Sequence, residues 1–378
     1  MTSDYLKYAI PTFFLLIFIE ALYSHFKGLK LYNLRNSLSC LACGLFTTSF
    51  EVFSKAAFAV TYIWVSEHFA ITQLPDNHWA TWLAALIIFD FIWYWAHRYS
   101  HEINLLWAGH VPHHHPEEFN LSTGLRQGAL QDLMFWPLYI TMAFMGFSVE
   151  MFFAHLLINK FYGFWLHTKA IDKIPLLEGI FSTPSAHRVH HGMNDKYLDK
   201  NYGGILIIFD RLFGTYQTEV EPVIFGVRKR YTSYNPVSAH FEWLHAMWQD
   251  AVRTANLGDK FKIWFKPTGW RPADVEQKYP RVKFSADTYK KLDSPRKPYP
   301  VMPMLIIFNI VATTNLILLF VPGLSMTLKL AIFAFITLGL LVLGRVLNLS
   351  KGEDVLTTTA LENQPVQHHS QDQMAPAE

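Results

Sequence analysis

The feature that most constrains this sequence is a series of apolar runs that are long enough to cross a lipid bilayer. A membrane-spanning helix needs about 20 apolar residues. Only 16% of the 378 residues are charged, against about 25% in a typical soluble domain. We therefore expect an all-α fold, a polytopic bundle of membrane helices. The expected spans are residues 8–26, 37–69, 79–96, 301–321 and 326–348, with a hairpin of two further segments within 130–166.

The same runs divide the chain into four expected parts. Residues 1–78 hold the N-terminal spans, and residues 79–300 combine a span with a long, mostly polar region. Residues 301–349 form a closing membrane hairpin, which is split by a proline and a glycine. Residues 350–378 are polar and are predicted to be disordered.

Basic residues predict how the spans are oriented. Lys27, Lys30 and Arg35 follow the first run without an acidic residue, and residues 251–300 carry an excess of lysine and arginine. Such segments stay in the cytoplasm, so the polar region is expected on the cytoplasmic side. The N-terminus lacks a basic stretch and a cleavage site, so the first run is expected to remain as a span. A net charge of +2 gives no reason to expect a nucleic-acid partner.

Three boxes of histidine are the chemical signature of the sequence. The stretch HRYSHEINLLWAGHVPHHH holds the first two boxes, and the third repeats the spacing of the second. Residues three and four apart share one face of a helix, so each box can direct several imidazoles to one point. The box residues are His97 and His101, then His110, His113 and His114, then His187, His190 and His191.

Eight imidazoles exceed the needs of one metal ion, because a catalytic zinc takes three protein ligands and a structural zinc four. The HEXXH pattern of zinc proteases is absent, since Glu102 is followed by Ile-Asn-Leu. The set fits two metals with open positions, and two irons near a membrane surface indicate dioxygen activation. His167 is the best ninth ligand, whereas His115 and His155 are weaker candidates. His368 and His369 are interpreted as part of the polar tail.

Acidic residues near the boxes could hold the second nitrogen of ligating histidines. The candidates are Asp90, Glu102, Asp199 and Asp210, of which Asp90 lies inside an apolar span.

Two polar features in the early spans have mainly structural interpretations. Glu51 and Lys55 lie four apart within an apolar run and are expected to pair, with the lining of a cavity as the alternative. Cys40 and Cys43 have CxxC spacing, but their small apolar neighbours favour helix packing over redox or metal chemistry.

Two long segments resemble the fatty acid hydroxylase and sterol desaturase superfamily of membrane di-iron enzymes. They run from Asp90 to Gln127 and from Phe164 to Tyr216. Within the superfamily they are most similar to the alkylglycerol monooxygenases, which cleave ether lipids with tetrahydrobiopterin. The likeness covers roughly residues 8–275 and is most specific around the boxes.

The resemblance implies that the eight box histidines bind two Fe ions and that His167 matches a further histidine of the family. It also implies roles for Glu102, Asn120, Arg126 and Gln127, which match segments flanking the first two boxes, and residues 79–300 become the catalytic domain. Some superfamily members have another histidine four positions before His167, where this chain has Gly163.

Three functions remain open from the sequence. The first is a monooxygenase that hydroxylates a lipid alkyl chain, with dioxygen and a tetrahydrobiopterin reductant, and so cleaves an ether lipid. The second is a sterol or fatty-acyl hydroxylase or desaturase that receives electrons from an electron-transfer protein. The third is a metal transporter, although transport favours ligands along the membrane interior rather than at the ends of spans.

Overall fold

The computed structural model describes residues 2–281, 284–285 and 300–349, and these residues form helices joined by loops. Five helices are long and apolar enough to cross a membrane. This confirms the all-helical, multi-pass fold predicted from the apolar runs. The five are α1 (Thr2–Phe26), α2 (Leu34–Phe69), α3 (Trp79–Glu102), α16 (Val301–Phe320) and α17 (Met326–Asn348).

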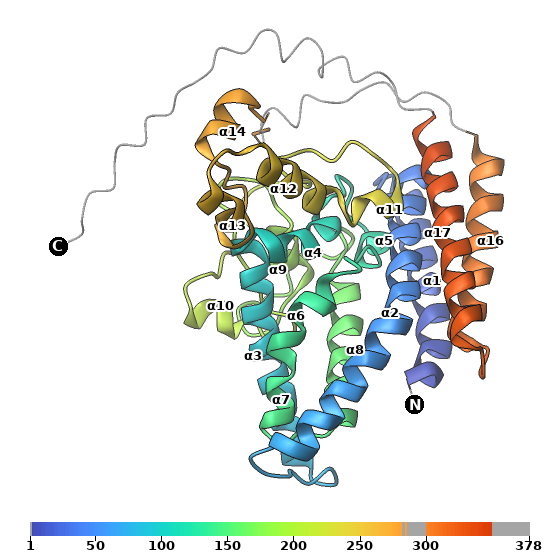
Figure 1. Ribbon diagram of the computed structural model, residues 1–378. Helices are drawn as coiled ribbons and strands as arrows, with labels where there is room; N and C mark the ends of the chain where they lie inside the picture. The colour runs from blue at the N-terminus through green and yellow to red at the C-terminus, as the bar shows by residue number, and fades with distance from the viewer. Residues whose placement is uncertain (1, 282–283, 286–299, 350–378) are drawn as a thin grey trace.

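The expected second segment is one continuous helix of 36 residues, α2. Its first turn is capped by the Asn33 side chain, which accepts a hydrogen bond from the Asn36 N–H; such caps stabilise a helix by about 1 kcal/mol. In Figure 1, α2 runs obliquely across the molecule. It packs against the α16–α17 hairpin through one apolar cluster and against α3, α6 and α8 through another.

The expected hairpin within residues 130–166 forms, but from helices shorter than the membrane-spanning ones. Pro137 lies inside the first, and the chain turns at Gly146, which has φ +89°. A Cβ at Gly146 would meet the Thr72 carbonyl oxygen at 2.1 Å, so the turn fits closely against the loop between α2 and α3. The hairpin helices are α6 (Gln131–Tyr139), α7 (Thr141–Phe144) and α8 (Val149–Trp165).

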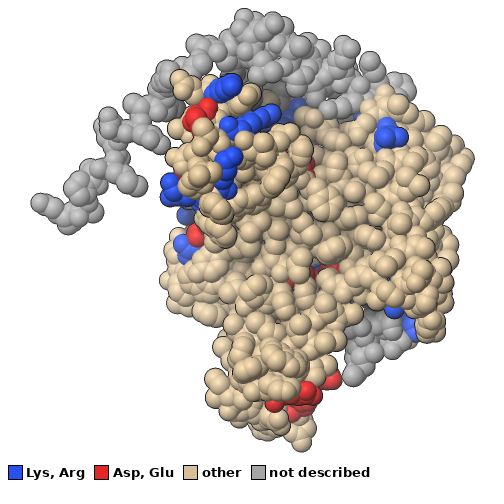
Figure 2. Space-filling view, in the orientation of Figure 1, with Lys and Arg blue, Asp and Glu red and all other residues tan. Residues whose placement is uncertain are grey.

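Shorter helices cover the end of α3 at the top of Figure 1. They carry or surround the second and third histidine boxes. Lys and Arg gather mainly over α12–α14 in Figure 2, a group of Asp and Glu lies at the opposite end, and uncharged surface separates them. The covering helices are α4 (Asn104–His114), α5 (Leu121–Gly124), α9 (Pro184–His190), α11 (Pro236–Ala239), α12 (Glu242–Arg253), α13 (Leu257–Phe265) and α14 (Ala273–Lys278), while α10 (Ile208–Leu212) lies beside α3, below them in Figure 1.

The predicted pairing of Glu51 with Lys55 is confirmed by a contact of 2.5 Å between Lys55 Nζ and the carboxylate. Lys160 of α8 joins the same carboxylate at 2.7 Å and also contacts Asp132 of α6 at 2.7 Å. The charges thus tie three helices together inside an apolar bundle. Cys40 and Cys43 are buried as free thiols, as the packing interpretation expects. The C-terminal tail, with His368 and His369, lies outside the described residues.

Candidate metal centre

The predicted histidines come together in two buried groups inside the covering helices. Within each group the ligand nitrogens lie within 4.8 Å of one another. The five-histidine group contains His97, His101, His110, His114 and His190, and the four-histidine group contains His113, His167, His187 and His191. The rings of His114 and His191 stack between the groups with centroids 4.3 Å apart, so the groups are direct neighbours.

Helical spacing explains how the second and third boxes serve both groups, whereas His97 and His101 of the first box both belong to the five-histidine group. His110 and His114 are four apart on α4 and share the five-histidine group, whereas His113 belongs to the other group. Likewise His187 and His191 are four apart and share the four-histidine group. The prediction that each box is directed to one point is therefore correct for residues four apart. The member next to the pair points to the other group, because adjacent positions on a helix point about 100° apart.

The hydrogen bonds of the five-histidine group fix which ring nitrogens face its centre. His97 Nδ1 donates to the Tyr202 carbonyl at 2.8 Å, and His110 Nδ1 donates to the Gln131 side-chain oxygen at 2.6 Å. Because both partners only accept, each neutral ring has a bare Nε2. These two Nε2 atoms nevertheless lie 3.0 Å apart. Two lone pairs at this distance repel each other unless a cation binds both.

The four-histidine group repeats this arrangement. His113 Nδ1 donates to the Arg126 carbonyl at 2.7 Å, and His167 Nδ1 donates to the Gly163 carbonyl at 2.8 Å. Their Nε2 atoms lie 3.1 Å apart, and the Nε2 of His187 is 3.0 Å from that of His167. Metal–nitrogen bonds of about 2.1 Å place two ligands at right angles about 3.0 Å apart. Both groups therefore have the dimensions of a metal site.

Unpartnered nitrogens support the same conclusion. Within the described part of the chain, the buried Nε2 atoms of His101, His190 and His191 have no hydrogen-bond partner. A buried polar atom without a partner costs about 1–3 kcal/mol, and a metal ion in each group would satisfy all three. The nine histidines thus fit two metal ions on the chemistry of their donor atoms.

Burial keeps these histidines neutral, which is the form that binds metal. It lowers the pKa of His110, His114 and His190 well below the usual histidine value, and neighbouring histidines lower it further. Burial also lowers the pKa of His113 to about 4. Protons therefore compete weakly for the Nε2 atoms at neutral pH.

Close backbone contact brings Gln131 to its histidine. A Cβ at Gly128 would meet the Gly109 carbonyl oxygen at 1.7 Å, so the loop before α6 touches α4 directly. Gln131, in the first turn of α6, then reaches His110. The sequence analysis missed Gln131, because nothing in its local pattern distinguishes it from other polar residues.

Asp210 and Asp90 hold the loop that supports His97. Asp210 accepts hydrogen bonds from the N–H groups of Tyr202 and Gly203, each at 2.7 Å. Asp90 accepts from the N–H groups of Ile205 and Leu206 at 2.9 and 2.6 Å. Burial raises the pKa of Asp210 to about 6. Both carboxylates act on His97 through the Tyr202 loop, and neither touches the imidazole groups.

Three other residues named from the sequence lie outside the two histidine groups. Glu102 is exposed and pairs with Arg98 at 2.8 Å, while Asp199 lies 3.7 Å from His101 Nδ1. Asn120 is buried, where it caps α5 and donates to the Leu31 carbonyl at 2.7 Å.

Arg126 joins α4 to α2. Its guanidinium donates to the Pro112 carbonyl at 2.7 Å and to Ser39 Oγ at 3.1 Å. Its own carbonyl accepts from His113.

Two of the weaker histidine candidates lie outside both groups. His115 stacks on Tyr231 with centroids 4.3 Å apart and lies 3.5 Å from Glu242. His155 donates to the Met151 carbonyl within α8.

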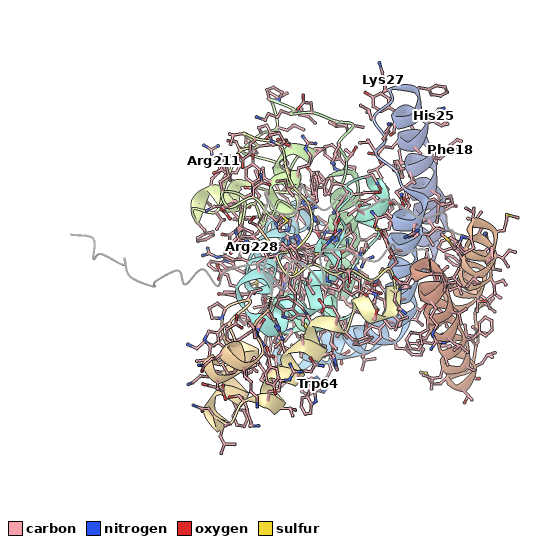
Figure 3. The ribbon with its side chains drawn as sticks, turned by 90° about the horizontal axis from the view of Figure 1, so that it is seen from above. Phe18, His25, Lys27, Trp64, Arg211 and Arg228 are labelled. Carbon is pink, nitrogen blue, oxygen red and sulfur yellow. The ribbon has the colours of Figure 1, made fainter. Side chains whose placement is uncertain are left out.

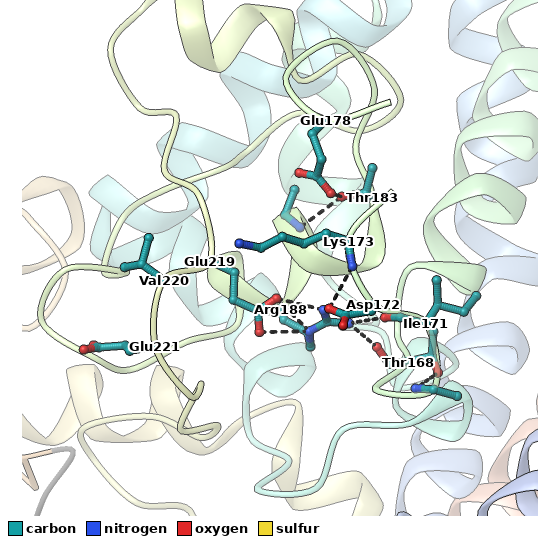
Figure 4. A network of polar contacts seen from close by, with 12 residues as sticks. Thr168, Ile171, Asp172, Lys173, Glu178, Thr183, Arg188, Glu219, Val220 and Glu221 are labelled. Atoms are coloured by element: carbon teal, nitrogen blue, oxygen red, sulfur yellow. Dashed lines mark hydrogen bonds and ion pairs between the residues drawn. The ribbon is translucent and has the colours of Figure 1, made fainter. Parts of the chain in front are cut away.

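An arginine that the sequence analysis overlooked joins the third box to His167. Arg188 donates to the carbonyls of Thr168 and Ile171 at 2.9 and 2.7 Å, and it pairs with Glu219 at 2.8 Å (Figure 4). It thereby fixes the segment after His167 against α9. The sequence could have identified Arg188 by its place between His187 and His190, because a charged residue inside a metal box needs a buried partner.

Glu20, a buried carboxylate of α1, supports the four-histidine group from the membrane side. It accepts the Leu121 N–H at 2.8 Å and is bonded to the hydroxyls of Tyr32 and Thr168. α1 is thus tied to α5 and to the residue after His167.

Comparison with known proteins agrees with this geometry. The model of the fatty acid hydroxylase family matches residues 82–215, the region that holds all three boxes and His167. Alkylglycerol monooxygenase of Danio rerio is 34% identical over 351 residues, which cover 90% of this chain and 77% of that protein. This chain belongs to the fatty acid hydroxylase family. The resemblance found in the box segments is thereby confirmed.

Two further relatives define the range of the match. Alkylglycerol monooxygenase of Homo sapiens is 38% identical over 271 residues, or 71% of this chain and 60% of that protein. The ornithine lipid hydroxylase OlsE of Rhizobium tropici is 32% identical over 145 residues, or 36% of this chain and 42% of that protein. The chain thus spans about three fifths of the human relative's length. No solved structure gives a significant match.

Proposed function

We propose that this chain is a membrane monooxygenase that holds two iron ions and hydroxylates a lipid alkyl chain next to an ether oxygen. The observation that carries the proposal is the pair of buried histidine groups, in which bare Nε2 atoms face each other at about 3 Å. Imidazole-rich sites with open positions suit iron. Iron held there would supply dioxygen activation for attack on an unactivated C–H bond.

The position of the groups suits a lipid substrate. His97 and His101 lie in the last two turns of the membrane-spanning helix α3. A lipid whose head group stays in the interface can therefore bring its first chain carbons to this level without leaving the bilayer. A transporter, by contrast, would need ligands along the membrane interior, and both groups lie at the end of a span.

The proposed reaction consumes two electrons. One oxygen atom of O2 is inserted into the C–H bond next to the ether oxygen, and the other leaves as water with two protons. The resulting hemiacetal breaks its C–O bond to give a fatty aldehyde and the free glycerol hydroxyl. The electrons come from a reduced pterin such as tetrahydrobiopterin, or from an electron-transfer protein.

The ether-lipid substrate is supported by the relatives, which are named alkylglycerol monooxygenases. A second candidate is the hydroxylation of an acyl lipid, which the shorter match to an ornithine lipid hydroxylase favours. Both candidates use the same two histidine groups.

The deciding experiment compares two assays on the iron-loaded protein. An alkylglycerol, O2 and tetrahydrobiopterin should yield a fatty aldehyde, and the His187→Ala protein is the control that should yield none. An acyl lipid or sterol with ferredoxin or a cytochrome forms the second assay. Product in the second assay alone would retain the enzyme class and overturn the ether-lipid substrate.

We also propose that the site faces the cytoplasm, on the grounds of the basic residues around α1 and α12–α14. A cysteine placed at Val252, which is exposed on α12, should resist a membrane-impermeant thiol reagent in intact cells. It should react after lysis, whereas the native cysteines are buried. Labelling from outside would reverse the orientation.

A further inference from the structure

An exposed apolar surface lies beside α3, away from the histidine groups. We call it the α10 platform, and it combines the segment before α9 with α10. Its side chains point away from the core, and the most exposed are Leu176 at 87% and Leu212 at 68%. The platform consists of Leu176, Ile180, Phe181, Ile208, Leu212 and Phe213.

The two halves of the platform are joined into one unit. Phe181 and Leu206 form an antiparallel bridge, and the Ile207 N–H donates to the Ile180 carbonyl at 3.0 Å. Arg211 donates to the Gly179 carbonyl at 3.4 Å. Seen from above, Arg211 lies at the rim of the molecule, on the side away from α16 and α17 (Figure 3). The exposed apolar side chains are therefore held in place by backbone contacts.

The platform continues the surface of α3 that faces lipid. Leu83, Ile87 and Phe91 are exposed at intervals of four residues and form one stripe along α3. The ring of Phe213 lies 6.3 Å from that of Phe91 and 5.0 Å from that of Trp95. These ring contacts join the platform to the stripe.

Depth along α3 shows where the platform lies in the bilayer. With a rise of about 1.5 Å per residue, Phe91 and Trp95 lie about 18 and 24 Å from exposed Trp79 at the start of α3. The hydrocarbon core is about 30 Å thick. With Trp79 at one boundary of this core, α10 lies about 6–12 Å inside the other boundary, which is the one nearer the histidines. Helices that lie in the interface bury their apolar face by about 5–10 Å, which matches this depth.

We propose that the α10 platform is a second membrane contact, inserted among the acyl chains of the leaflet on the histidine side. The proposal rests on the assignment of α3 as a membrane span and not on the reaction. It also links the membrane to the site. Asp210 lies within α10 and holds the Tyr202 loop, whose carbonyl accepts from His97.

Fluorescent labels on single cysteines test the platform in the full-length protein, in phosphatidylcholine vesicles that contain nitroxide-labelled lipid. The Leu212→Cys label should be quenched by the lipid nitroxide nearly as strongly as a Leu83→Cys label on α3. The matched control is Val252→Cys, which is 61% exposed on α12 beyond the end of α3. Its label should be quenched several-fold less by lipid and more by aqueous iodide.

Each outcome decides the question. If the Leu212 label behaves like the Val252 label, with strong iodide quenching, the platform faces water and the proposal is wrong. If it is shielded from both quenchers, a protein covers the platform, which also overturns the lipid contact. If the Leu83 label escapes lipid quenching, the span assignment of α3 fails and the proposal fails with it. None of these readings requires activity, so a failed assay for ether-lipid cleavage leaves the test intact.

Discussion

The two histidine groups share the second and third boxes but differ in the elements that support them. The five-histidine group takes two members from the membrane span α3, and its rings are held by the Tyr202 loop and Gln131. The four-histidine group has no member on a span, and Arg188 and Glu20 fix its surroundings. The five-histidine group thus has ligands on a membrane span itself, whereas the four-histidine group is tied to the span α1 only through the contacts of Glu20.

The two groups also differ in how much room they leave for exogenous ligands. The four-histidine group lacks the histidine that some superfamily members have at the position of Gly163, and a Cβ there would meet no atom within 4 Å. Fewer protein ligands would leave more positions open at a metal ion bound there. We infer that the five-histidine group is the more closed of the two.

The largest expected effect is that a histidine substitution in either group removes the metal ion of that group. Wild-type protein should hold two metal ions per chain, natively iron, whereas His97→Ala and His187→Ala should each lose one ion and all turnover. Membrane insertion should persist, because the apolar spans are unchanged. Metal analysis and membrane fractionation measure both. A single ion in well-folded wild-type protein would contradict the two-group interpretation.

The next largest effect should be that acid lowers the stability of the metal-free protein. The folded-state pKa of His113, about 4, lies below its ordinary value of about 6.5. Its contribution to stability is therefore complete above pH ~6.5 and is lost as the pH falls through about 4. The melting temperature of metal-free protein should decrease over this range. Metal-loaded protein should hold its melting temperature to lower pH, since the metal competes with protons; equal curves would disprove the assignment.

Loss of Gln131 should affect the five-histidine group alone. Gln131→Ala removes the acceptor that orients His110, and such changes weaken metal binding by about 10–100-fold. Chelator titration should then show one weakened ion and one unchanged ion. The matched change Gln127→Ala lies beside the four-histidine group, because Gln127 Nε2 is 3.3 Å from His113 Nδ1. If both variants weaken the same ion, the groups are not independent.

A smaller effect should separate two glycines near His167. A Cβ at Gly124 would lie 3.0 Å from His167 Nδ1 and 3.1 Å from the Phe164 carbonyl. Gly124→Ala should therefore displace His167 and lower the metal occupancy of the four-histidine group. Gly163→Ala has open space on α8 and should raise stability by up to about 1 kcal/mol. Thermal unfolding and metal content together distinguish them, and equal losses would contradict the geometry.

The smallest effects should come from histidines outside both groups. His115→Phe keeps an aromatic ring against Tyr231 and should leave the two metals and turnover close to wild type. His368→Ala and His369→Ala in the tail should do the same. Loss of a metal in any of these variants would add that histidine to the ligand set.

The sequence by itself determined the spans and the histidines that meet. Apolar runs of about 20 residues permit little besides membrane helices, and the boxes place imidazoles at helical spacing. Both patterns are local, because each apolar run and each box lies within one segment of the chain. They can therefore be identified without the fold. The set of nine histidines chosen from the sequence is the set that the structure brings together.

Only the tertiary structure decided how the histidines divide and what orients them. His113 and His114 are adjacent in sequence but belong to different groups, because the partners that complete each group come from α3, α9 and the end of α8. The acceptors of the Nδ1 protons are mostly backbone carbonyls, such as that of Tyr202, 105 residues from His97. A carbonyl is present at every residue, so only the folded chain determines which one reaches an imidazole.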